Sequence, residues 1–81
     1  GGLNKVRGDV RLVLDGEARV LRLTFGALAE IESELGVADL AELGVRLRML
    51  SARDLLLVLG ALLRGAGEDE AAERLPAARI D

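Results

Sequence analysis

Acidic side chains are the most abundant groups in this chain that could do acid–base or metal chemistry. The sequence has no His, Cys, Tyr or Trp, so the commonest proton shuttle and the thiol nucleophile are missing. Glu30, Glu32 and Glu34 follow one another at intervals of two residues. On a helix this spacing sends the three carboxylates in different directions, so they do not converge on one site.

A second group of acids opens the C-terminal part of the chain. It consists of Glu68, Asp69, Glu70 and Glu73. Neighbouring acids on a helix fan out around its axis, and their order does not follow the pattern of a calcium-binding loop. We therefore interpret this group as a solvated helix start.

The hydroxyl groups and glycines complete the search for chemistry. Thr24 and Ser51 each precede a helical pattern and are expected to cap it, which leaves Ser33 without a histidine base. The glycines match neither common phosphate-loop spacing. The sequence thus predicts a protein that is not an enzyme, with no catalytic residue, cofactor, metal ion or small-molecule substrate.

Composition favours a small module that binds other proteins. The chain has 81 residues, 51% of them hydrophobic, with a single Phe. A domain of this size buries only about 60–65% of the surface of its unfolded chain, so its own core is thin. Leucine is plentiful enough that some apolar surface is expected to remain for a partner.

Charge and hydropathy exclude two other classes of partner. The net charge is −3 and there is one aromatic residue, whereas nucleic-acid binding favours a basic excess and stacking aromatic rings. The longest apolar run, residues 55–63, is far shorter than the roughly 20 residues that cross a bilayer. The N-terminus carries no signal pattern. We expect a cytoplasmic protein that binds neither nucleic acid nor membranes.

The hydrophobic period changes at Thr24 and predicts an α+β domain. Before Thr24, apolar residues alternate around an Asp15-Gly16 turn, which predicts an antiparallel β-hairpin with strands 8–14 and 17–23. A two-residue turn places Leu14 opposite Glu17. The same register places Asp9 beside Arg22. The inward face then carries Val10, Leu12, Leu14, Leu21 and Leu23.

After Thr24 the apolar spacing becomes helical and predicts three to four short helices packed on one face. The first runs from the Thr24 cap to Gly36, and the second starts at Asp39 and is shortened by Gly44. The third starts at Ser51. Its apolar arc of roughly 160° is wider than a usual helix stripe. This arc is centred on Leu55, Val58, Leu59 and Leu62.

The domain organisation follows from these elements. Residues 1–7 are predicted to be a flexible lead-in, and residues 8–65 to form a single hairpin-plus-helices domain. Residues 66–81 are predicted to be a linker, a short acidic helix that ends at Pro76, and a poorly ordered tail.

Partner-binding residues are predicted where apolar side chains fall outside the expected core. They are Val13, Val20, Val45, Leu56, Leu57 and Leu63. Two strands alone leave unpaired edges, so a homo-oligomer joined through the hairpin is also expected.

Several strings resemble a family of short proteins encoded among the phage-like tail genes of alphaproteobacterial gene transfer agents and related prophages. The resemblance covers roughly residues 7–65. It is carried by Arg7-Gly8-Asp9-Val10, Leu14-Asp15-Gly16, Leu21-Arg22-Leu23-Thr24-Phe25-Gly26-Ala27-Leu28-Ala29-Glu30-Ile31-Glu32 and Leu50-Ser51-Ala52-Arg53-Asp54-Leu55-Leu56.

The resemblance implies a role in building a phage-like tail. The family is labelled both a tail-tube protein and a tail assembly chaperone, and we favour a chaperone that binds the tape-measure or tail-tube protein during particle assembly. One alternative is a structural subunit retained in the tail. Another is a regulatory adaptor, unrelated to tails, that acts through its Arg-rich hairpin.

Overall fold

The computed structural model describes residues 9–79 and shows an α+β fold, as predicted. The predicted lead-in, residues 1–7, lies outside the described residues. The elements in chain order are strands β1 (Val10–Leu14) and β2 (Glu17–Leu21), helices α2 (Phe25–Leu35), α3 (Leu40–Leu47), α4 (Ala52–Gly65) and α5 (Asp69–Arg74), and a 3₁₀ turn (Leu75–Ala77).

The hairpin has the predicted register. Leu14 lies opposite Glu17, and the two strands are antiparallel. Asp15 and Gly16 have φ values of 51° and 80°, which is the pair of positive φ angles that a tight two-residue hairpin turn requires. The Arg22 guanidinium donates to both oxygens of Asp9, over 2.8 and 3.0 Å, and confirms the predicted cross-strand pair.

Side-chain caps start three of the helices as predicted. The side chains of Thr24, Asp39 and Ser51 accept hydrogen bonds from backbone N–H groups in the first turns of α2, α3 and α4. Helix α2 ends at Gly36, whose left-handed backbone has φ 69°. The N–H of Val37 returns to the Glu32 carbonyl over 3.0 Å, so the end of α2 is closed by local bonds.

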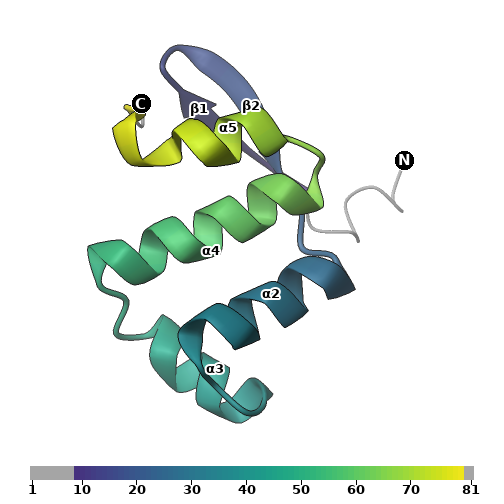
Figure 1. The fold of residues 1–81 in the computed structure, drawn as a ribbon, viewed down its shortest axis with the longest axis vertical. Helices are drawn as coiled ribbons and strands as arrows, with labels where there is room; N and C mark the ends of the chain where they lie inside the picture. The colour runs from purple at the N-terminus through teal and green to yellow at the C-terminus, as the bar shows by residue number, and fades with distance from the viewer. Residues whose placement is uncertain (1–8, 80–81) are drawn as a thin grey trace.

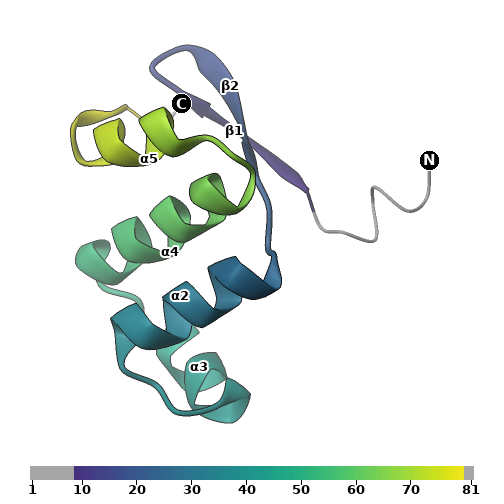
Figure 2. The same ribbon diagram turned by 45° about the vertical axis from the view of Figure 1, so that its right-hand side comes forward.

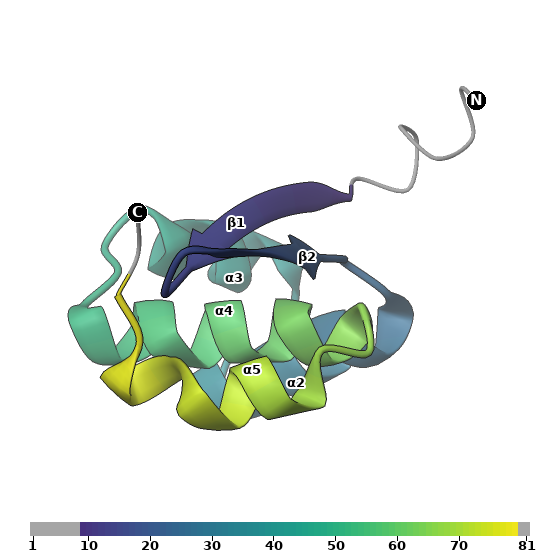
Figure 3. The same cartoon turned by 90° about the horizontal axis from the view of Figure 1, so that it is seen from above.

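The helices form a layer with two elements on one side of it. Helices α5, α4 and α2 lie side by side, with α4 in the middle (Figures 1 and 2). The hairpin and α3 both lie on the same face of this layer (Figure 3). In Figure 1 the hairpin lies toward the α5 end of the layer and α3 toward the α2 end.

Helix α4 separates two small cores. On one flank the fully buried Leu63 packs with residues of the hairpin, α5 and the 3₁₀ turn. On the other flank Ala61, also fully buried, packs with residues of α2 and α3. Leu62 lies between the flanks and contacts both cores. This arrangement corrects the predicted orientation of α4, because Leu55 was expected at the centre of its apolar arc, whereas it is 42% exposed.

The C-terminal segment belongs to the same domain, which corrects the boundary predicted at residue 66. Ala72 and Leu75 are buried in the core that contains Leu63. Arg79 exchanges two hydrogen bonds of 2.9 Å with Asp15, one through each backbone N–H. The predicted short acidic helix is present as α5, and up to residue 79 the segment packs against the hairpin instead of forming a loose tail.

A glycine allows the hairpin to meet α4 at close range. The N–H of Arg22 donates to the Leu62 carbonyl over 3.0 Å. A Cβ atom on Gly65 would lie 2.4 Å from the Arg22 carbonyl oxygen and 3.2 Å from the Ala27 Cβ. The backbone of β2 and the end of α4 thus approach each other more closely than any larger residue at position 65 permits.

We expect Gly65→Ala to destabilise the fold by about 1–3 kcal/mol, because the new methyl group meets rigid backbone. The matched control is Gly44→Ala. Gly44 also lies in a helix, has open space around its Cβ position, and should gain about 1 kcal/mol. Urea unfolding of both variants measures the difference. Equal free energies of unfolding for the two variants would contradict the close approach at Gly65.

Candidate protein-binding groove

An apolar groove lies between the hairpin and α3, over α2 and α4. Its volume is about 250 Å³, and every residue that lines it is apolar. We call it the leucine groove, and its lining residues are Val10, Leu21, Leu23, Leu28, Ile31, Leu43, Leu47, Val58 and Leu62.

The leucine groove follows from the two-sided packing of α4. The flanks of α4 are used by the two cores, and Val58 and Leu62 fall on the arc of the helix between those flanks. Strand β1 contributes Val10 and the connection between β2 and α2 contributes Leu23, which are 55% and 52% exposed, and α3 contributes Leu47, which is 44% exposed. These side chains form apolar walls that no other described element covers.

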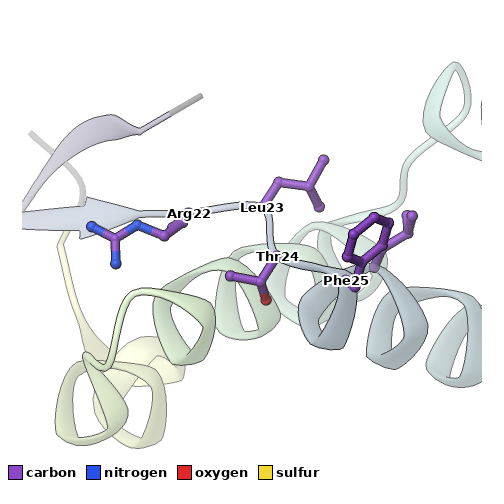
Figure 4. Close-up of a pocket in the computed structure, with 5 residues that line it drawn as sticks. Arg22, Leu23, Thr24 and Phe25 are labelled. Carbon is purple, nitrogen blue, oxygen red and sulfur yellow. The ribbon is translucent and has the colours of Figure 1, made fainter. Parts of the chain in front are cut away.

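A second hollow extends the leucine groove at the start of α2. Its volume is about 450 Å³, and it shares Leu23 and Leu28 with the leucine groove. Figure 4 shows Leu23 and Phe25 projecting to the same side of the chain, whereas Thr24 points to the other. Phe25 is 93% exposed, so the only aromatic ring of the protein lies in solvent beside the groove.

Arginine–carboxylate pairs hold the elements that frame the groove. Arg46 of α3 donates to the Leu35 carbonyl over 2.8 Å and to Asp54 over 3.0 Å, which ties α3 to α2 and α4. Arg64 of α4 is bonded to Glu30 of α2. This hydrogen bond raises the pKa of the Arg64 guanidinium, which therefore stays protonated at every physiological pH.

The two edges of the hairpin differ. On the β2 edge the N–H of Val20 donates to Glu68 over 2.9 Å, and the next outward N–H, that of Arg22, donates to α4. Glu68, expected to be solvated, therefore covers a strand edge. On β1 the outward positions are Arg11 and Val13, opposite Val20 and Ala18. Among residues 9–79 these two have no backbone bond outside the hairpin.

The structure does not bring the predicted partner-binding residues together. Val13 and Val20 lie on the face of the hairpin turned away from its inward leucines, and the exposed Val45 lies on α3 outside the leucine groove. Leu56 and Leu57 line a separate hollow between α4 and α5. The role of Val13, Val20, Val45, Leu56 and Leu57 in binding stays a prediction, and these residues do not form one common surface.

Leu63 is a correction. Its side chain is 0% exposed and lies at the centre of the core between the hairpin and α5, so a partner cannot reach it in the folded protein. It was predicted to bind a partner because the packing of the C-terminal segment against that side of α4 was not foreseen.

The sequence placed Val10 and Leu23 on the inward face of the hairpin, and Val58 and Leu62 in the apolar arc of the third helix. Within residues 9–79, however, Val10 and Leu23 stay 55% and 52% exposed. Two signals could have found the groove. The apolar arc predicted for α4 was wider than a usual helix stripe, and the chain was too short to bury all its leucines.

The sequence matches the family described as "Phage tail tube protein, GTA-gp10" over residues 7–81. The chain belongs to this family. Searches of the curated proteins and of the solved structures return no match. The family description confirms the predicted connection with gene transfer agents and phage tails, and gives no support to an adaptor unrelated to tails.

Among the described residues of this family member, no helix is long and apolar enough to cross a membrane. Residues 9–79 also contain no group of three or more acidic side chains arranged to hold a metal ion.

We expect Leu63→Ala to cost about 2–5 kcal/mol of stability, as truncation of a fully buried leucine does. Phe25→Ala should change stability by less than about 0.5 kcal/mol, because the ring is almost fully exposed. Guanidinium unfolding of both variants measures the two costs. A large loss from Phe25→Ala, or none from Leu63→Ala, would contradict the assignment of groove and core.

Proposed function

We propose that this protein is a tail assembly chaperone, and that its leucine groove holds the apolar face of a helix from another tail protein, the tape-measure protein in the first place. The observation that carries the proposal is the groove, open and lined entirely by apolar side chains, in a member of a phage-tail family.

The form of the groove supports a helix as its occupant. An amphipathic helix docks by laying an apolar stripe into a hydrophobic groove. Here the groove is framed by three helices and a hairpin, and Phe25 offers an aromatic contact at its mouth. Aromatic side chains at such positions commonly contribute much of the binding energy. The occupant would be shielded from solvent in the bacterial cell until the tube forms around it.

The hairpin edges favour a chaperone over a tube-forming subunit. A ring built by strand pairing needs each subunit to offer two open edges, since each edge joins a different neighbour. In this protein the β2 edge is occupied by Glu68 and α4, which leaves β1 alone for strand pairing. Two subunits that pair through their single open edges form a dimer, and this dimer cannot add further subunits to build a ring.

A structural subunit retained in the tail is the second candidate, and the family description favours it. In that case the groove would be filled by a neighbouring subunit or by the tape-measure protein in the finished particle. The two candidates share the groove and differ in whether the protein remains in the particle.

Co-expression with the long helical protein encoded among the same tail genes tests the chaperone proposal. The partner should co-purify and become more soluble. The double variant Leu23→Gln/Leu47→Gln should weaken capture at least about tenfold, because it places amides in the apolar walls of the groove.

The matched control is Leu40→Gln/Val45→Gln, which changes two exposed residues of α3 outside the groove. Capture by this control should equal that by the unchanged protein. No co-purification, or equal loss from both double variants, would overturn the assignment of the groove. Circular dichroism of each variant confirms that it is folded.

Mass spectrometry of purified particles separates the two candidates. A chaperone should be absent from finished particles or present far below the copy number of the tube subunit. Presence in proportion to the tube rings would establish the structural subunit instead.

A further inference from the structure

The β1 strand offers a single open edge with a short, self-complementary sequence. Its outward backbone groups belong to Arg11 and Val13, and the structure places neither residue in a backbone bond outside the hairpin within residues 9–79. Exposed edges of this kind pair readily with another strand, and natural proteins usually block them. In this protein the β2 edge is blocked and the β1 edge is not.

The residues of β1 restrict how a second copy could pair with it. In an antiparallel pair of β1 strands, residues whose backbone N–H and C=O groups point out of one hairpin pair with residues of the same kind in the other copy. A register with Arg11 opposite the partner's Arg11 sets like charges face to face, which is destabilising. A register with Arg11 opposite the partner's Asp9 competes with the bidentate Asp9–Arg22 pair and overlaps little of the strand. A register with Val13 opposite the partner's Val13 sets Arg11 opposite the partner's Asp15, and the N–H of Asp15 already donates to the Arg79 carbonyl.

The last register uses the full length of the strand. Arg11 then lies opposite the partner's Val13 and exchanges both of its backbone hydrogen bonds with it. Leu12 lies opposite the partner's Leu12 on the two-fold axis, and Val10 lies opposite the partner's Leu14. Within residues 10–14 no two like charges are directly opposed. Just beyond the strand ends, Asp9 lies opposite the partner's Asp15, and its carboxylate is neutralised by the bidentate pair with Arg22.

The geometry points to a homodimer in which two copies of β1 pair antiparallel about Leu12 and form a continuous four-stranded sheet. The apolar inward faces of both hairpins join across the axis, and the half-exposed Val10 gains an apolar neighbour. Because the β2 edges are blocked, the assembly stops at two copies. This interface shares only Val10 with the leucine groove and needs no occupant in it, so it stands or falls independently of the proposed function.

Single-cysteine cross-linking tests the register, since the chain has no cysteine of its own. In the proposed dimer the two Leu12 residues form a pair without hydrogen bonds between them. Their Cα atoms would then lie about 4.5 Å apart, within the range of a disulfide. Leu12→Cys should form a covalent dimer on mild oxidation. Ala18→Cys, exposed on β2, should not.

Charge variants at the exposed Val13 give a second test that leaves the core untouched. In the symmetric dimer each copy's residue 13 lies opposite the partner's Arg11, so the contact occurs twice. The Val13→Glu side chain attracts that Arg11, whereas the Val13→Lys side chain repels it. By sedimentation equilibrium we expect the dimer of the Glu variant to bind about tenfold more tightly than that of the Lys variant. The difference should shrink in high salt.

Three results would overturn the dimer. They are a monomer at all concentrations up to the millimolar range, equal dissociation constants for the two charge variants, and efficient cross-linking through Ala18→Cys. A reversed order of the charge variants would show that Val13 faces the partner's Asp9 and would also reject the register. A dimer that forms while the tail partner fails to bind would reject the proposed function alone.

Discussion

The packing of α4 on both flanks is the constraint on which the rest of the structure depends. Leu63 faces one core and Ala61 the other, and both are fully buried. A helix enclosed on two sides has little apolar surface to spare in most small domains. Here the sequence supplies Val58 and Leu62 on a third side, where the described chain offers no element to cover them. The groove therefore results from the packing of α4 against one core on each flank, which leaves its third side uncovered.

The hairpin is held to this helix by backbone contacts as well as by the apolar core around Leu63. The close approach at Gly65, the bond from Arg22 to α4 and the bond from Val20 to Glu68 all fix β2. Strand β1 is attached mainly through β2. As a result, the helices enclose the β2 edge of the sheet, whereas the β1 edge faces solvent. The molecule therefore has an apolar groove that can bind a helix and a separate strand edge that can pair with another strand.

The parts of the fold that local interactions determine could be predicted from the sequence. The Asp15-Gly16 turn sets the hairpin register, and the caps at Thr24, Asp39 and Ser51 set three helix starts. The burial of Leu75 could not be predicted, because it depends on the C-terminal segment folding back onto the hairpin and α4, which no local sequence pattern encodes. The groove was missed for the same reason. Periodicity shows which side chains share a face, but it does not show whether another element covers that face.

Methyl NMR of the protein with a helical segment of its tail partner tests most directly whether the uncovered side of α4 is the binding surface. The account predicts shift changes at the methyl groups of Val10, Leu23 and Leu47 as the segment is added, with Leu40 and Val45 unchanged. Changes confined to Leu40, Val45 or the hollow beside α5, with the groove methyls unaffected, would contradict it.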